Sequence, residues 1–172
     1  FLTWANISDP TTEQRSSFPN IAVDPAGNAV AIWKTFLDDN TTKVEAATLP
    51  AASFTWSSPV TLANSLVIID PLVAVDMNGN AVAIWSASGI LQSALLPFGK
   101  SWTHPKDITK ATIGAGELHI DMTSCAYAVI AYTAQVFATS REVVQTVHSI
   151  GLFPPTPPIS LKGRIIKNEF LT

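Results

Sequence analysis

Apolar residues of large and small size alternate in several short runs along the chain. Residues 21–23 read Ile-Ala-Val, and residues 29–32 read Ala-Val-Ala-Ile. A third run, at residues 44–49, alternates Val, Ala and Thr with Glu, Ala and Leu. A period of two residues is typical of a β-strand with one face in a core. The pattern therefore predicts short β-strands throughout these segments.

A turn motif separates the first two predicted strands. Residues 24–28 read Asp-Pro-Ala-Gly-Asn, and residues 76–80 read Asp-Met-Asn-Gly-Asn. Glycine adopts a positive φ without a Cβ clash, and an Asp carboxylate accepts hydrogen bonds from backbone N–H groups just downstream. We therefore predict hairpin turns built by the following residues: Asp24, Gly27 and Asn28 in one copy, Asp76, Gly79 and Asn80 in the next, and Asp121 in a third.

These strands and turns belong to an internal repeat. Residues 19–33 align with residues 71–85, and a less regular third copy runs over residues 118–132, where Met-Thr-Ser-Cys replaces the glycine-containing turn. A fourth strand is predicted over residues 56–62 and 102–108, and similar segments occur at residues 158–161 and 4–8. Four short strands in roughly 50 residues match the size of one β-propeller blade.

The repeat divides a single domain, residues 1–172, into five parts. The predicted parts are a lone outer strand at residues 1–9, blades at residues 18–63, 70–109 and 115–163, and a tail at residues 164–172.

The segments at residues 20–28 and 73–80 resemble the first-strand signature of NHL-type and related bacterial β-propeller repeats, in which a hydrophobic strand ends in Asp-x-x-Gly-Asn. The resemblance implies an all-β, β-propeller-like array of about three four-stranded blades plus the extra N-terminal strand. It implies no particular activity.

Three blades are too few for a closed ring, because propellers usually have about 4 to 8 blades. An open array would leave a sheet edge and an apolar face in water. We expect either a homo-oligomer, with a dimer favoured, or further blades in a longer chain. In an oligomer, the N-terminal strand could complete a blade of a neighbouring copy.

Composition narrows the class of partner. The chain is 47% hydrophobic and 13% charged, with a formal net charge of -3. With this charge balance, the chain lacks the excess of basic residues that is typical of proteins that bind nucleic acid. The most apolar run is shorter than the roughly 20 residues of a membrane span, and the lone Cys125 cannot form an internal disulfide. The low charge and the many Ala, Ser and Thr residues favour an extracytoplasmic location, periplasmic or secreted.

No catalytic residue, cofactor or metal site is predicted. His104, His119 and His148 lack the spacings of metal ligands, and no nucleophile elbow or phosphate-binding loop is present. The repeated aspartates could form a ring of carboxylates that holds a cation or acts as an acid and base pair. We favour the structural interpretation, since a residue repeated together with its turn is needed by that turn.

Aromatic residues and one long loop are the candidates for ligand binding. Trp33 and Trp85 could stack on sugar rings, although packing between blades is the favoured interpretation. The loop after Trp33 is longer than its counterpart in the second copy, and loops on a rigid scaffold often bind ligands. Its candidate residues, which could also form only a solvated turn, are Lys34, Phe36, Asp38, Asp39 and Asn40.

The predicted function is therefore a non-catalytic propeller module that binds a protein or a small ligand. Two alternatives stay open: a glycan-binding lectin that uses aromatic stacking, and a propeller-type hydrolase, glycosidase or lactonase, that works through carboxylates or a bound cation.

Overall fold

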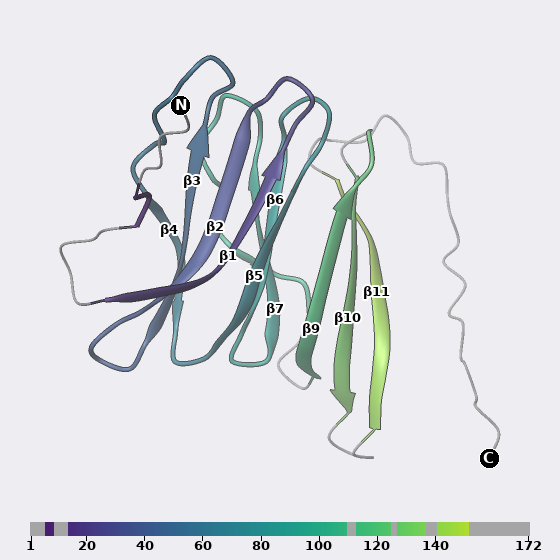
Figure 1. Cartoon of the computed structure of the whole chain (residues 1–172). Helices are drawn as coiled ribbons and strands as arrows, with labels where there is room; N and C mark the ends of the chain where they lie inside the picture. The colour runs from purple at the N-terminus through teal and green to yellow at the C-terminus, as the bar shows by residue number, and fades with distance from the viewer. Residues whose placement is uncertain (1–5, 9–13, 110–112, 125–126, 137–140, 152–172) are drawn as a thin grey trace.

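The computed structural model describes residues 6–8, 14–109, 113–124, 127–136 and 141–151, and every element within them is a β-strand (Figure 1). The predicted all-β fold is confirmed. The strands form three antiparallel sheets, each with its strands in chain order. The first sheet comprises β1 (Arg15–Val23), β2 (Ala29–Phe36), β3 (Thr42–Leu49) and β4 (Val60–Ser65).

The second and third sheets continue the same meander. The second comprises β5 (Ile68–Val75), β6 (Ala81–Ala87), β7 (Ile90–Leu96) and β8 (Lys106–Asp107). The third comprises β9 (Ile113–Met122), β10 (Tyr127–Val136) and β11 (Arg141–Gly151). The fourth strand predicted at residues 158–161 and the tail at residues 164–172 lie outside the described residues.

The first strands of successive sheets pack together, because β5 contacts both β1 and β9. Figure 1 shows the three sheets following one another from the purple end of the chain to the green end. In a propeller, the sheets are arranged radially as blades. The three sheets have this arrangement and are called blades below.

Two predicted strand bounds are wrong. The fourth strand of the first blade begins at Val60 and that of the second at Lys106, rather than at Trp56 and Trp102. Pro59 and Pro105 immediately precede these strands, and proline cannot donate to a β-ladder. The tryptophan segments still join the sheets. Ser57 N donates to Thr48 O and Thr103 N to Leu95 O, both at 2.8 Å, and the Ser57 and Thr103 hydroxyls accept from the backbone N of Thr48 and Leu95.

The N-terminal segment also differs from its prediction. Within the predicted strand at residues 1–9, the described residues 6–8 do not form a strand. Ile7 instead packs with Trp56 against Ala31, Trp33 and Ala47 of the first blade. This segment therefore covers part of the face of the first blade that is turned away from the second blade.

Two apolar layers fill the spaces between the blades. Between the first and second blades, Val30, Ile32 and Val44 meet Val73, Ala83 and Trp85. Between the second and third, Val82, Ile84 and Leu91 meet Ala128, Ile130 and Tyr132. Each blade thus has a front face, turned toward the preceding blade, and a back face, turned toward the following one.

Candidate functional site

The aspartates of the repeated motif lie in their hairpin turns. Asp24 is 5% exposed, and its carboxylate accepts hydrogen bonds from the Asn28 backbone N at 2.8 Å and from Asn28 Nδ2 at 2.6 Å. Asp76 makes the same two bonds with Asn80, at 2.8 and 2.9 Å. Gly27 and Gly79 have φ angles of 93° and 81°. The carboxylates are therefore occupied by the turns that contain them.

The electrostatics of Asp24 follow from these bonds. Burial of Asp24 opposes its ionisation, but hydrogen bonds from the Asn28 side chain and from the backbone of Asn28, Ala26 and Gly27 outweigh burial. Together they hold the pKa of Asp24 below its ordinary value.

The asparagine of each motif also reaches a second loop. Asn28 Oδ1 accepts from the Ala51 backbone N at 2.9 Å, and Asn80 Oδ1 accepts from the Phe98 backbone N at 3.0 Å. Ala51 and Phe98 follow the third strands of their blades. The asparagine side chain therefore ties the first hairpin of a blade to the loop between its third and fourth strands.

Asp121 does not have the predicted place in the third turn. It lies within β9, exposed, and its Oδ1 accepts from the neighbouring Met122 N. The turn position belongs to Thr123, whose backbone N donates to Tyr127 O at 2.8 Å, as Asp76 N donates to Asn80 O. Thr123 Oγ1 accepts from Tyr127 N at 3.3 Å. The three aspartates therefore do not form a ring of equivalent carboxylates.

Trp33 and Trp85 are buried, at 3% and 0% exposure, so neither indole face is open to a ligand. Trp85 Nε1 donates to Gln92 Oε1 at 2.9 Å, across the β6–β7 pair. Glu45 lies opposite Trp33 in the same way but accepts from Thr35 and Lys43. Trp33 Nε1 consequently has no hydrogen-bond partner within the described part of the chain.

Lys34 joins the first two blades. Its Nζ donates to Asp70 Oδ1 at 2.8 Å and to Ile68 O at 3.3 Å, and it lies 3.9 Å from the centroid of the Phe18 ring. The centroid of the Phe36 ring lies 5.5 Å from the same ammonium. Lys34 is 8% exposed, so the geometry makes it an inter-blade contact rather than a group open to ligand.

Two β-bulges create the surroundings of Lys34. The register of β1 shifts between Ser17 and Asn20, and that of β5 shifts between Ile69 and Leu72. Proline stands in both shifts, at Pro19 and Pro71. Phe18 has a φ of 54° and precedes the first proline, as Asp70 precedes the second. The bulges redirect these two side chains to the same lysine.

The rest of the predicted binding loop forms a tight, exposed turn. Asn40 N donates to Leu37 O at 3.1 Å, and Asn40 has a φ of 63°. Asp39 Oδ1 accepts from the Thr41 hydroxyl and backbone N, and these bonds lower the pKa of Asp39. Asp38 is exposed beside them. None of these residues lines the hollow described next.

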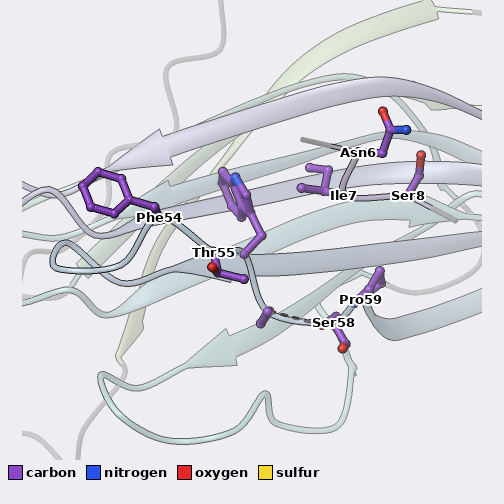
Figure 2. A pocket seen from close by; sticks show the side chains of 9 residues that line it. Asn6, Ile7, Ser8, Phe54, Thr55, Ser58 and Pro59 are labelled. Atoms are coloured by element: carbon purple, nitrogen blue, oxygen red, sulfur yellow. Dashed lines mark hydrogen bonds between the residues drawn. The ribbon is translucent and has the colours of Figure 1, made fainter. Parts of the chain in front are cut away.

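A shallow hollow lies elsewhere, at the outer edge of the first blade (Figure 2). Its lining consists of two segments: Asn6, Ile7 and Ser8 on one side, and Phe54, Thr55, Trp56, Ser57, Ser58 and Pro59 on the other. The Phe54 side chain is fully exposed and projects at one end, while Asn6, Ile7 and Ser8 lie at the other (Figure 2). We call this hollow the edge groove.

The edge groove has a neutral lining, with two aromatic rings beside amide and hydroxyl groups. Trp56 and Ile7 are anchored in the apolar cluster around Trp33, so the floor of the groove is held by the core. Residue Trp56 was predicted as the start of a fourth strand, and Phe54 belongs to no repeated motif, so the sequence did not mark this groove.

Within the described ranges, no group of three or more His, Cys, Asp or Glu side chains is placed to hold a metal ion. No helix long and apolar enough to cross a membrane occurs among the residues that the structure describes.

Comparisons with known proteins point to the fold alone. No family model and no curated protein matches the chain. Among the solved structures that resemble it is "Hadza microbial sialidase Hz136", with a TM-score of 0.57 and 14% sequence identity over 78% of this chain. The chain spans about a third, 35%, of the length of that protein. The likeness agrees with the sheet arrangement above: the chain is an all-β array of β-propeller blades.

Proposed function

We propose that the chain is a non-catalytic, propeller-type binding module and that its ligand is a carbohydrate bound in the edge groove. The observation that carries the proposal is the fully exposed Phe54 ring beside Trp56 in a lining without charged residues. An aromatic ring has a negative face that attracts the slightly positive C–H edge of a sugar. The neighbouring Asn6, Ser8, Thr55 and Ser58 offer hydroxyl and amide groups to sugar hydroxyls.

The acidic side chains argue for binding rather than hydrolysis. Most of those in the described residues are engaged in local bonds: Asp24 and Asp76 in turns, Asp39 with Thr41, Asp70 with Lys34, Glu45 with Thr35, and Asp107 with Gln92. Most glycosidases use two carboxylates that flank the scissile bond, whereas sialidases use a tyrosine nucleophile. The lining of the edge groove contains neither a carboxylate nor a tyrosine.

The likeness to a sialidase makes sialylated oligosaccharides the first glycans to test, together with neutral ones. The test is an array of both classes, probed with the full chain and with Phe54→Ala. Loss of the exposed ring should weaken binding about fivefold to thirtyfold, equivalent to roughly 1–2 kcal/mol, while the melting temperature stays unchanged.

Leu66→Ala is the matched control, because Leu66 is a 70% exposed apolar residue outside the edge groove. Its binding should equal that of the unmodified chain. Absence of glycan binding by the unmodified chain, or equal binding by Phe54→Ala, contradicts the proposal. Release of sialic acid from the array would replace it with a catalytic function.

A further inference from the structure

The two interfaces within the chain follow one rule. In each, the back face of one blade meets the front face of the next. The aromatic residue near the end of the second strand always lies on the front face: Trp85 packs toward the first blade and Tyr132 toward the second. Trp33 is their counterpart in the first blade, and no preceding blade faces it among the described residues.

The front face of the first blade has the composition of a buried interface. Ile21 and Val23 occupy the positions that Val73 and Val75 occupy in the second blade. Val73 is 5% exposed, whereas Ile21 and Val23 are 57% and 58% exposed. Ile7 and Trp56 cover the outer part of this face, around Trp33, and leave the inner part along β1 open.

The back face of the third blade corresponds to the back faces that the first and second blades use in their interfaces. Val129 corresponds to Val82 of the second blade and Val30 of the first, as the register of the hairpins shows. Those two valines are 0% and 5% exposed, whereas Val129 is 37% exposed, next to Tyr127 at 39%. One chain therefore carries both halves of the interface that it already uses twice.

We propose that a second copy of this chain covers these faces, with the first blade of each copy packed on the third blade of the other. The contact continues the interface already formed between blades, and it joins two different faces, so it is head-to-tail. Two copies supply six sheets, which lies within the range of about 4 to 8 blades that closes a propeller ring.

Polar groups near the contact indicate how firmly it holds. His119 and Asp121 are exposed on β9 and alternate with Leu118 and Ile120, which face the second blade. Asp121 pairs with Val129 where the first two blades have Ala22 and Ala74, so these polar residues lie within the new contact, opposite the apolar Ile21 and Val23. Mixed polarity is typical of interfaces between partners that also exist apart. We therefore expect a dimer that dissociates on dilution.

Sedimentation velocity of the full chain over a dilution series tests the proposal. The expected mass is twice 18.4 kDa at high concentration, falling toward 18.4 kDa on dilution. Val23→Lys on the front face and Val129→Lys on the back face should each give the 18.4 kDa species at concentrations where the unmodified chain is dimeric. Both valines are already partly exposed, so the far-UV circular dichroism spectrum should not change.

Met77→Lys is the control, because Met77 is 59% exposed in a turn of the middle blade and should leave the dimer intact. A monomer at every concentration overturns the proposal. A Val129→Lys protein that stays dimeric while Val23→Lys dissociates also overturns it, since that result means two front faces meeting each other. The dilution series of the unmodified chain decides the question even if a variant fails to fold. Ile7 and Trp56 line the edge groove and also border the front face, whereas Val23 and Val129 line no part of the groove. The lysine variants therefore test the dimer without altering the groove, and Phe54→Ala tests carbohydrate binding.

Discussion

Lys34 and Asp70 form an ion pair between blades whose two ends differ in exposure. The Lys34 side chain is 10% exposed, and the Asp70 side chain is 47% exposed. A carboxylate that loses its partner at this position remains hydrated. An ammonium that loses its partner remains among Phe18, Phe36 and the backbone of Ile68. The cost of breaking the pair therefore depends on which residue is removed.

We expect Asp70→Ala to lower the free energy of unfolding by about 2–3 kcal/mol and Lys34→Met by about 1 kcal/mol. The reason is that Asp70→Ala leaves a charge in a poorly hydrated place, whereas methionine fills the space of the lysine stem. Urea denaturation of the two variants measures the difference. Equal losses, or a larger loss for Lys34→Met, would show that packing rather than charge dominates.

The carboxylate of Asp24 makes stability depend on pH. Its pKa is lower in the folded chain than the ordinary 3.8, because the Asn28 and turn hydrogen bonds outweigh burial. A depressed folded pKa means that the stabilisation is present above the unfolded pKa and is lost as the pH falls through the folded pKa. We expect the free energy of unfolding to fall below pH about 4, and to fall less steeply in Asp24→Asn. Denaturation curves at a series of acidic pH values measure both slopes, and identical slopes would contradict this role for Asp24.

At the scale of the element, Gly27 and Gly79 occupy the same position of the same turn but have different surroundings. A Cβ at Gly27 would meet nothing closer than Ala51 Cβ, at 3.6 Å. A Cβ at Gly79 would lie 2.6 Å from Phe98 Cδ2 and 3.0 Å from Asp24 Oδ2. The second turn is therefore crowded by its own blade and by the first blade.

Both alanine variants should lose about 1 kcal/mol because alanine is strained at these positive φ angles. Gly79→Ala should lose more than Gly27→Ala, since Phe98 or the Asp24 carboxylate must also move. Thermal unfolding of the two variants provides the comparison, and each is the control for the other. A larger loss for Gly27→Ala would mean that the contact between the two turns does not form.

The sequence predicted the elements better than their exact register. Alternating residues predicted the strands, and the repeated Asp and Gly predicted the turns of the first two blades. The shared aspartate placed the third copy two residues out of register, because Thr123 rather than Asp121 makes the turn bonds. Matching Trp85 to Tyr132 gives the observed register, since packing between blades fixes the position of a buried aromatic residue.

The candidate site was less predictable than the fold. A tryptophan that packs and a tryptophan that binds sugar look the same in the sequence, and only their burial distinguishes them. The edge groove joins two segments about 50 residues apart whose contact no local pattern encodes. Likewise, the Lys34–Asp70 pair depends on two bulges, and the alternation of apolar residues does not reveal an extra residue in a strand.

At the scale of the whole molecule, the described chain is a row of three blades with two internal interfaces and two unpaired faces. The same apolar positions are buried between blades and exposed at the ends of the row, so their exposure comes from location and not from composition. A surface of this kind is a common cause of association.

The asparagine that ties the two hairpins of a blade also affects how a blade loses its structure. In the first and second blades, the Asn28 and Asn80 amides bridge both halves, so one hairpin cannot separate without releasing the other. In the third blade, Tyr127 stands in that position and has no amide to make the bridge. The first and second blades are thus each expected to open as one cooperative unit.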